Sequence, residues 1–339
     1  NAAYYKYFLN VNVVMVSVSP MDRHGYFNFS VNTGVAAPIV RAADIVIVEV
    51  NEHLPTVHGG YDECIHISEV DYVVEGEHEM FADNVAPEPT ETDRRIAKHL
   101  IPYIVDGSTL QLGIGSMPNA LGEIIAQSDL KDLGMHTELC SDAYLKMYEA
   151  GKLTNHKKRL DRGKGVFGCA VGSRRLYDWL DENPGVAAYP LEYVNRPSII
   201  AQIDNMVSIN SCVAMDLYGQ VAAESSGSRQ ISGTGGQLDF LIGASASHGG
   251  KAFICMSSVY RDRDGETHSR IVPQFNGDII TSPRSQVYFL ATEYGVINLE
   301  GRSTWERAEA LISIAHPAFR DRLIREAQER RIWRRSNKR

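Results

Sequence analysis

The chain has 339 residues, 44% of them hydrophobic and 22% charged, which is enough for two globular domains of ordinary size. Its net charge of −8 argues against a nucleic-acid-binding protein, because such a protein needs a basic surface to neutralise phosphates. No apolar run approaches the roughly 18 residues of a membrane span, and no signal peptide is visible. We therefore expect a cytoplasmic protein with neither nucleic-acid nor membrane partners.

The cysteines and the N-terminal histidines indicate neither disulfides nor a metal site. The five cysteines are dispersed and form no C-x-x-C pair, so reduced thiols are expected. His53, His58 and His66 lie in or near a loop with proline and glycine, without an acid-rich partner motif. The prediction is that the protein binds no metal.

The N-terminal region is predicted to form buried strands joined by loops. The runs 11–18 and 45–50 are nearly continuous in β-branched residues, as in strands covered on both faces. A helix is expected to end within 39–43, and a short strand to span 72–74. The chain opens at Asn1 on a strand-like aromatic stretch, so we expect the natural protein to begin upstream.

An acidic segment with two prolines, 81–92, predicts a domain boundary. The N-terminal domain is expected over 1–86, the linker over 87–91 and the C-terminal domain over 92–339. Thr92 is expected to cap the first helix of the second domain. The basic tail 330–339 is expected to be solvated. The basic run 157–159 is expected to be a solvated surface, with attraction of a ligand's phosphates as the alternative.

The second region alternates strands with helices, which predicts a mainly parallel sheet with right-handed crossovers. The expected strands are 109–112, 134–140, 165–171, 206–209, 252–256 and 286–291. The expected helices are 118–127, 173–180, 305–314 and 317–330, with Pro118 in a first turn.

The segment 110–120 (LQLGIGSMPNA) places two glycines where a buried strand gives way to a helix. Glycine lets the backbone approach a ligand closely, and a helix N-terminus favours an anion. The segment has neither the G-K-[ST] of a Walker loop nor the third glycine of a dinucleotide fingerprint. From its spacing alone, a tight turn without a ligand explains it equally well.

Glu138 lies one helix later, near the end of the predicted strand 134–140. If this strand neighbours 109–112, Glu138 emerges at the same carboxyl edge as the loop 113–117. A carboxylate beside backbone N–H donors is a candidate nucleophile. Most glutamates at strand ends serve only a turn or a cap, so position alone does not assign this role.

A second glycine cluster, GTGGQLDF at 233–240, offers N–H groups to an oxyanion or to a pantetheine carbonyl. Glu224 precedes this loop and is a rival nucleophile. Asp239 is expected to cap a helix. Ser225 and Ser226 lie in no G-x-S-x-G elbow, which argues against a Ser/His/Asp hydrolase.

These segments together resemble the acetyl-CoA hydrolase/transferase family, and within it the butyryl-CoA:acetate and 4-hydroxybutyrate CoA-transferases. The resemblance spans nearly the whole chain. It is carried by GIGSMPNAL (113–121), HTELCSD (136–142), GQVAAESSGSRQISGTGGQLDF (219–240), SRIVP (269–273), TEYGVINLEGRS (292–303) and ISIAHPAFR (312–320).

The resemblance implies two similar open, mostly parallel α/β domains with the active site between them. It implies that Glu138, rather than Glu224, is the nucleophile. For Arg263 a solvated hairpin charge is an equal alternative to a contact with a CoA phosphate. The CoA-binding residues that it implies are Gly113, Ile114, Gly115, Ser116, Met117, Val213, Gly236 and Arg263.

The activity implied is transfer of CoA between a short-chain acyl-CoA and a carboxylate, through a glutamyl-CoA thioester and with ping-pong kinetics. Butyryl-CoA and acetate are the expected substrates, and 4-hydroxybutyrate and propionate stay open. Gly235 and Gly236 are candidate oxyanion donors. No cofactor beyond CoA, itself a substrate, is expected, and homo-oligomerisation is implied. Acyl-CoA hydrolysis and a non-catalytic CoA-binding protein stay open as alternatives, because sequence does not report how well water is excluded.

Overall fold

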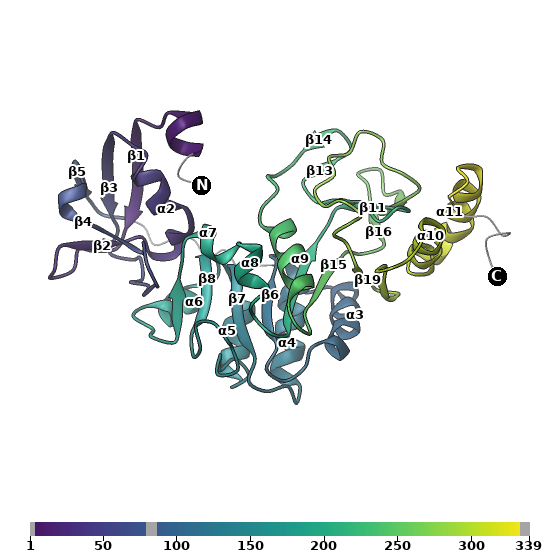
Figure 1. The fold of residues 1–339 in the computed structure, drawn as a ribbon, viewed down its shortest axis with the longest axis horizontal. Helices are drawn as coiled ribbons and strands as arrows, with labels where there is room; N and C mark the ends of the chain where they lie inside the picture. The colour runs from purple at the N-terminus through teal and green to yellow at the C-terminus, as the bar shows by residue number, and fades with distance from the viewer. Residues whose placement is uncertain (1–3, 79–86, 333–339) are drawn as a thin grey trace.

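The computed structural model describes residues 4–78 and 87–332 (Figure 1). The N-terminal unit contains a three-stranded parallel sheet in the order β1-β3-β5, made of β1 (Val13–Val18), β3 (Ile45–Val50) and β5 (Tyr72–Glu75). Helix α2 (Thr33–Val40) packs on it, and β2 (Tyr26–Asn28) pairs with β4 (Cys64–His66) at its side.

The small sheet is buried on one face only, and the prediction of strands covered on both faces is wrong. Val14, Val18, Val46 and Val48 alternate along β1 and β3 and form a core with α2. The intervening side chains point the other way, and Met15 among them is 78% exposed. Both faces of β1 and β3 carry apolar residues, which is why the sequence suggested burial on both sides. Among the described residues, only the face toward α2 is covered.

The larger unit is built on an eight-stranded sheet in the order β20-β19-β15-β10-β6-β7-β8-β9, parallel except for β20. This confirms the prediction of a mostly parallel α/β fold. That two similar domains enclose the site, and that they meet at 87–91, remain predictions. Its strands are β6 (Thr109–Leu112), β7 (Gly134–Cys140), β8 (Gly165–Ala170), β9 (Val186–Ala188), β10 (Met206–Ser211), β15 (Lys251–Cys255), β19 (Phe289–Thr292) and β20 (Gly295–Asn298).

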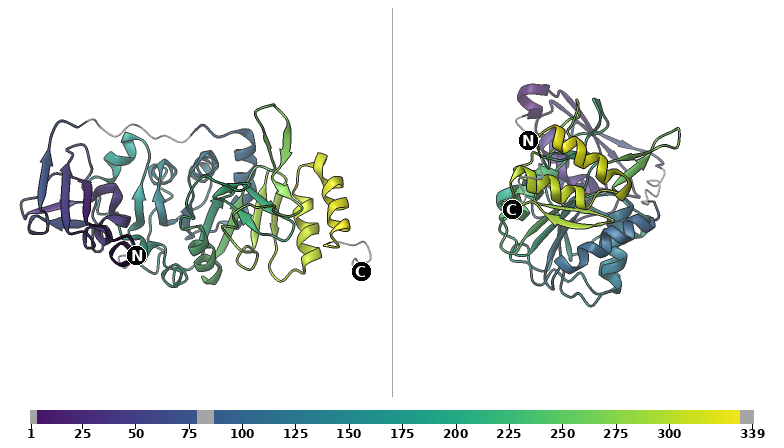
Figure 2. Two further views of the ribbon diagram at one scale, coloured as in Figure 1. Left: turned by 90° about the horizontal axis from the view of Figure 1, so that it is seen from above. Right: turned by 90° about the vertical axis from the view of Figure 1, so that its right-hand side faces the viewer.

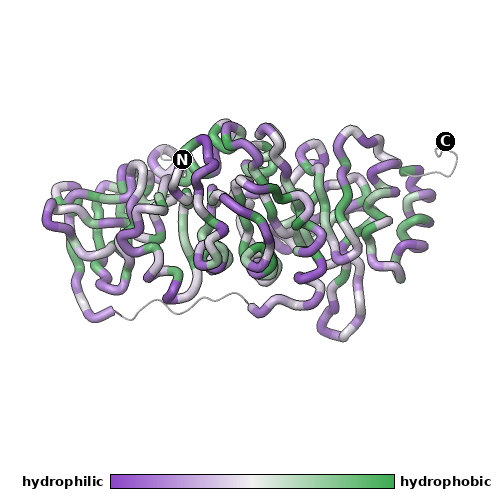
Figure 3. The backbone as a smooth tube through the Cα atoms, turned by 90° about the horizontal axis from the view of Figure 1, so that it is seen from below, coloured by the Kyte–Doolittle hydropathy of each residue, from purple (hydrophilic) through white to green (hydrophobic). Residues whose placement is uncertain are grey.

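Helices cover both faces of the large sheet (Figures 1 and 2). One layer, with its own core against β6 and β7, consists of α3 (Glu91–Leu100), α4 (Ser116–Gln127), α5 (Asp142–Glu149) and α6 (Arg174–Leu180). The opposite layer consists of α7 (Leu191–Val194), α8 (Pro197–Ile200) and α9 (Gln237–Ala246). Figure 3 shows hydrophobic (green) and hydrophilic (purple) segments alternating along the chain. In the central strands β6 and β10 nearly every residue is buried, as coverage on both faces requires.

The chain reverses direction across the sheet at β6. It first adds β7, β8 and β9 on one side of β6, and then returns to add β10, β15 and β19 on the other side. The helix after β6 lies on one face and α9 lies on the other. In open α/β sheets ligands bind beyond the carboxyl ends of the strands at such a switch point, so this edge of β6 and β10 is the expected binding site.

Strands β6 and β7 pair only at their start, through Thr109 with Gly134 and Leu110 with Met135. Farther along, the buried hydroxyl of Tyr144 accepts a hydrogen bond from Leu112 N at 2.9 Å and donates one to Leu110 O at 3.3 Å. The tyrosine thereby satisfies backbone groups that the missing ladder leaves unpaired. The two strands are held apart near the edge where the loop 113–117 and Glu138 emerge.

The N-terminal unit joins the large sheet at its β9 edge. Ala188 N donates to His58 O at 2.8 Å, and Glu182 N donates to Thr56 O at 2.8 Å, so the segment 56–59 continues the sheet. A side chain at Gly60 would overlap the ring of Tyr189, which explains a glycine at this contact. The junction is therefore made by backbone pairing and close packing.

The remaining segments lie beyond the carboxyl edge and at the far end of the molecule (Figure 1). A hairpin of β16 (Val259–Arg261) and β17 (Thr267–Ser269) projects outward, and α10 (Thr304–Ser313) and α11 (Pro317–Glu329) form the far end (Figure 2). Short strands make two further small sheets: β11 (Ala214–Asp216), β12 (Val221–Ala222) and β18 (Ile271–Val272), and β13 (Ser225–Ser226) with β14 (Arg229–Gln230).

Two predicted caps differ from the structure. Thr90, not Thr92, caps α3: its hydroxyl accepts from Asp93 N while the Asp93 carboxylate accepts from Thr90 N. Asp239 lies in the first turn of α9, whose N-cap is Gly236. The tail 330–339 lies mostly outside the described residues. None of the described helices is both long and apolar enough to cross a bilayer.

Replacing Tyr144 with phenylalanine tests how β6 and β7 are held apart. We expect Tyr144→Phe to lower the free energy of unfolding by about 1–3 kcal/mol, because Leu112 N would be left buried without a partner. Denaturant unfolding measures this. Tyr288→Phe is the control, since its hydroxyl bonds Ser285 O in an exposed position, and its effect should stay within about 0.5 kcal/mol. Equal effects of the two variants would contradict the proposed role of Tyr144.

Candidate active site

Glu138 is the fifth residue of β7 and lies near the strand's carboxyl end, half-buried. Its side chain is on the same face of the strand as that of His136, because side chains alternate along a strand. This is the face covered by α7 and α9. Asn195, directly after α7, donates from Nδ2 to Glu138 Oε2 at 2.9 Å. One carboxylate oxygen is thus held by a neutral amide.

The glycine loop before α9 lies directly against this carboxylate. A Cβ at Gly236 would overlap Glu138 Oε2 and the Asn195 amide, so no other residue fits without displacing them. Gly235 has φ of +56°, and a Cβ there would lie 3.9 Å from Glu138 Oε1. The loop therefore brings the predicted residues Gly235 and Gly236 to the predicted nucleophile, at the N-terminus of a ten-residue helix.

The negative charge of Glu138 acts on its neighbours. Burial and, to a lesser degree, the charge of Glu138 raise the pKa of the Asp239 carboxyl above its usual range. The same two causes raise the pKa of the Cys169 thiol to about 12, so this cysteine stays protonated. Asn195 Oδ1 is buried and has no hydrogen-bond partner among the described residues.

The predicted CoA loop lies at the switch point of the sheet. Gly115 has φ of +116° and is the N-cap of α4, so the loop turns sharply from β6 into the helix. A pocket of about 180 Å³ opens there. It lies between the loop, the ends of β10 and β15, and α3, and its lining includes Ile114, Gly115, Ser116, Met117, Cys212, Met256 and Arg270.

A buried polar network links β6 and β10 on the face of the sheet that α9 covers. Gln111 Oε1 accepts from Ser208 Oγ at 2.5 Å and from Asn210 Nδ2 at 3.0 Å, and Gln111 Nε2 donates to Asn210 Oδ1 at 3.0 Å. These side chains are on the same face of the sheet as Glu138. A fully satisfied network of this kind fixes the positions of its members, so the floor of the site is rigid.

The other predicted contacts are divided between the pocket and the surface. Val213 follows β10 and its carbonyl accepts from Arg270 at 2.9 Å, which places it beside the pocket. Arg263 is exposed in the turn of the β16–β17 hairpin. Arg270 lines the pocket and also stacks over Tyr260, with 5.4 Å from its guanidinium carbon to the ring centre. Arg270 is thus the arginine nearer to the loop.

Glu224, the rival nucleophile, has a different environment. It is 5% exposed, its carboxylate accepts from Thr281 Oγ1 at 3.3 Å, and its carbonyl accepts from Ile231 N. These contacts connect the strands that precede the glycine loop. The geometry therefore gives Glu224 a role in holding that loop, while Glu138 faces the glycines.

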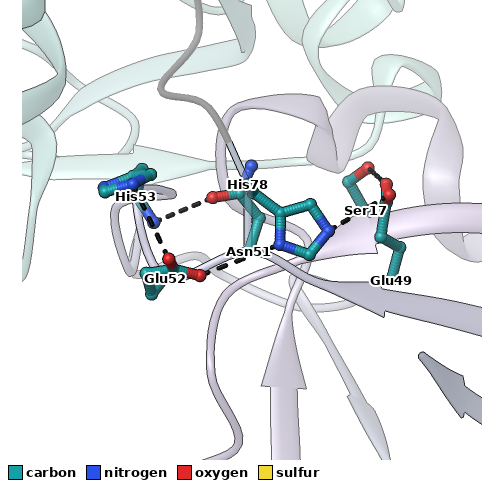
Figure 4. A network of polar contacts seen from close by, with 6 residues as sticks. All are labelled: Ser17, Glu49, Asn51, Glu52, His53 and His78. Carbon is teal, nitrogen blue, oxygen red and sulfur yellow. Dashed lines mark hydrogen bonds and ion pairs between the residues drawn. The ribbon is translucent and has the colours of Figure 1, made fainter. Parts of the chain in front are cut away.

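The histidines considered for a metal site, His53, His58 and His66, form no group of ligand atoms among the described residues. His53 and His78 contact the carboxylates of Glu52 and Glu49, and Ser17 donates to Glu49 at 2.8 Å (Figure 4). His66 instead bonds Ser68. Of residues 4–78 and 87–332, only one group of three His, Cys, Asp or Glu has ligand atoms within 4.8 Å of one another; it lies in the β16–β17 hairpin and consists of Asp262, Glu266 and His268.

Sequence reasoning missed three features of this site. Asn195 and Arg270 were not predicted as site residues, since neither belongs to a glycine motif. Arg270 does lie within the segment SRIVP, which helped to carry the family resemblance. Lys158 was predicted to be solvated, but it is only 3% exposed and donates to Met135 O at 2.9 Å and Lys164 O at 2.7 Å. Burial lowers the pKa of Lys158 to about 7.

Two domain models of one family match the chain. The acetyl-CoA hydrolase/transferase N-terminal domain matches residues 2–83, and the C-terminal domain of the same family matches residues 172–327. The first of these regions contains the small sheet, and the second contains the glycine loop and Arg270.

Similar proteins and structures carry related names. The butyryl-CoA:acetate CoA-transferase of Anaerostipes caccae is 50% identical over 99% of this chain and 76% of its own length. The 4-hydroxybutyrate coenzyme A transferase of Clostridium kluyveri is 42% identical over 95% of this chain and 73% of its own length.

Among solved structures, RipA from Yersinia pestis is 38% identical, with a TM-score of 0.91 over 98% of this chain and 73% of that one. A 4-hydroxybutyrate CoA-transferase from Porphyromonas gingivalis is 36% identical, with a TM-score of 0.84 over 97% and 78% of the two chains. The chain therefore belongs to the acetyl-CoA hydrolase/transferase family, which confirms the resemblance seen in its motifs.

Proposed function

We propose that the protein is an acyl-CoA:carboxylate CoA-transferase that uses Glu138 as its nucleophile. The observation that carries this proposal is the Glu138 carboxylate lying against a loop of glycines, with one oxygen held by Asn195. The relatives named CoA-transferases support the same activity.

A carboxylate suits this reaction because its adduct with an acyl group is itself activated. Glu138 attacks the thioester carbonyl, the C–S bond breaks, and an acyl-glutamyl anhydride and CoA thiolate are formed. The thiolate then attacks the glutamyl carbonyl, which releases the first carboxylate and leaves a glutamyl-CoA thioester. The acceptor carboxylate runs these steps in reverse. Every step conserves the activation of the thioester, and no metal, nucleotide or redox cofactor takes part.

The Gly235–Gly236 loop is placed to stabilise the oxyanion that forms at each step. Backbone N–H groups of this loop, or of the Gly115 loop, would each contribute about 3–4 kcal/mol to transition-state stabilisation. Asn195 holds Oε2, which leaves Oε1 as the oxygen that attacks.

We place CoA along the carboxyl edge of the sheet. The pocket behind Gly115 combines a helix N-terminus with Arg270, an environment that attracts an anion. Its volume of about 180 Å³ accommodates only part of CoA. The remainder would extend toward Val213 and the hairpin with Arg263, and these remote contacts would lend binding energy to the reacting centre.

The proposed substrates are butyryl-CoA and acetate, in line with the butyryl-CoA:acetate CoA-transferase that is 50% identical to this chain. The 4-hydroxybutyrate transferase, at 42% identity, makes 4-hydroxybutyrate the next candidate. We further propose that the protein acts in the cytoplasm as a homo-oligomer.

The first test is to mix the full-length enzyme with butyryl-CoA alone, digest it, and look by mass spectrometry for CoA on a peptide. We expect label on the peptide that contains Glu138, lost when acetate is added while acetyl-CoA appears. Label on the Glu224 peptide would reject the residue assignment. Steady consumption of butyryl-CoA without label would indicate hydrolysis, and neither label nor turnover would indicate a binding protein.

Matched substitutions at the two glutamates extend this test. Glu138→Gln should lower acetate-dependent turnover by on the order of 10³-fold or more, because an amide cannot form the anhydride. Glu224→Gln changes a carboxylate of greater burial outside the reacting centre, and should leave turnover within a few-fold of the wild type. The reverse order of effects would contradict the assignment.

Gly236→Ala tests the close approach of the loop. The added Cβ overlaps Glu138 Oε2, so the carboxylate or the loop must move by about 1 Å, a displacement that can cost about 10²-fold in kcat. Gly227→Ala is the control, because a Cβ there meets nothing within 4 Å, although its φ of +59° brings some strain. Steady-state kinetics with butyryl-CoA and acetate measure both. Equal kcat values for Gly236→Ala and Gly227→Ala would contradict the proposed contact.

Arg263→Ala tests the predicted phosphate contact. An exposed charge pair contributes up to about 1 kcal/mol, so KM for butyryl-CoA should rise by about 2- to 5-fold with kcat unchanged. The effect should disappear with the thioester of dephospho-CoA if Arg263 meets the 3′-phosphate. An unchanged KM would support the alternative of a solvated hairpin charge.

A further inference from the structure

Helix α7 is too short to hold its own position. It has four residues, fewer than a stable isolated helix requires, so tertiary contacts must fix the orientation of Asn195 that follows it. Besides packing in the core, two side-chain hydrogen bonds outside the reacting groups contribute to this. Tyr193 Oη donates to Asp161 at 2.8 Å, and His136 Nε2 lies 2.9 Å from Val194 O.

The contact from His136 is the one adjacent to the site. A carbonyl oxygen only accepts, so His136 Nε2 carries the hydrogen and donates it. The ring is fully buried on β7, two residues before Glu138 and on the same face of the strand. Its ring centre lies 6.2 Å from that of Tyr193 and 6.3 Å from that of Phe240 on α9. His136 thus contacts both elements that complete the site.

Its surroundings keep this ring a constant donor. Burial, reinforced by the charge of Lys158, lowers the pKa of His136 to about 3, against the opposing effects of Val194 O and Asp161. The folded-state pKa is depressed, so the ring is neutral throughout the pH range in which the protein would work. A neutral ring with one hydrogen, on Nε2, cannot act as a proton donor and acceptor that changes state during turnover.

Two consecutive residues at the end of α7, Val194 and Asn195, are therefore bound by two residues on one face of β7. On β7, His136 binds Val194, and Glu138 is bound by Asn195. Side chains two residues apart on a strand are separated by about 6.6 Å. Because His136 and Glu138 keep this spacing, their two hydrogen bonds fix the position of the end of α7. If the His136 contact is lost, the end of α7 keeps the Tyr193–Asp161 hydrogen bond, but Asn195 loses the support that lies nearest to Glu138.

We propose that His136 is a positioning residue, which holds Val194 O so that the Asn195 carboxamide keeps Glu138 Oε2 bound and leaves Oε1 to attack. This inference rests on the proposed function of Glu138. It goes beyond that function by assigning a role to a residue that touches neither substrate nor the reacting atoms. The competing explanation is that His136 only fills the core.

The test compares two substitutions at His136 with one at a distant site. His136→Leu keeps an apolar side chain but removes the donor, whereas His136→Gln keeps an N–H. Thr292→Val is the matched control: Thr292 is 1% exposed and donates to Ile314 O at 2.7 Å, on β19. The Thr292→Val substitution leaves the buried carbonyl of Ile314, at the end of α10, without its partner, and this position is away from Glu138.

We expect His136→Leu to lower kcat by on the order of 10- to 100-fold with KM for butyryl-CoA within about 2-fold, because misplacement affects the chemical step. His136→Gln should recover most of kcat. Thr292→Val should leave kcat within about 2-fold, even where its melting temperature falls as far as that of His136→Leu. A folded His136→Leu enzyme with the kcat of Thr292→Val would overturn the proposal.

A double-mutant cycle separates positioning from packing. If His136 acts through Asn195, His136→Gln or His136→Leu should change kcat by less than about 2-fold in an Asn195→Ala background. If the fold-losses of kcat from the His136 and Asn195 substitutions simply multiply in the double variant, the proposal is overturned. Should His136→Leu fail to fold, the same cycle is made with His136→Phe, which keeps a ring but also lacks the donor. Wild-type enzyme without CoA label at Glu138 would instead reject the proposed function, so the two failures are distinguishable.

Discussion

The close approach of the Gly236 backbone to the Glu138 carboxylate is the constraint on which the rest of the site depends. A nucleophile that forms an anhydride needs donors for the oxyanion within hydrogen-bonding distance, and backbone groups reach that distance only where no Cβ intervenes. The loop can lie there because α9 covers the same sheet face to which Glu138 points. The sheet topology places the Gly115 loop at the adjacent strand end, so a thioester bound along this edge would meet the carboxylate.

Rigidity beneath this edge comes from polar groups that are buried and neutral. Gln111, Ser208 and Asn210 satisfy one another across β6 and β10, and the Tyr144 hydroxyl satisfies the backbone where β6 and β7 separate. Each of these hydrogen bonds contributes little net stability while both partners are present. Removing one partner is strongly destabilising, because it leaves a buried polar group unpaired. Strands β6 and β7 can therefore separate toward the carboxyl edge while Leu112 N and Leu110 O keep a hydrogen-bond partner.

The parts of this arrangement that follow from local chain geometry were predictable from sequence. Strands 109–112 and 134–140 have the predicted bounds, and each is followed by glycine or polar residues that end it. Glu138 could be placed at the edge for that reason. Asn195 could not, since it comes 57 residues later from a four-residue helix without a pattern of its own. Lys158 was misjudged because a run of charges suggests a surface, while tertiary contacts with two carbonyls bury its middle member.

The exchange proposed for Glu138 accounts for the absence of a paired cation from its described surroundings. None of the ion pairs among the described residues involves Glu138, and its side-chain hydrogen bond comes from an amide. A fixed cation would stabilise the free carboxylate more than the uncharged anhydride and would slow attack. A glutamate and a fatty-acid carboxylate are chemically alike, so each exchange is nearly balanced in free energy if no charge favours one partner. An amide orients one oxygen while leaving this balance intact, which is the condition for a transfer that runs in both directions.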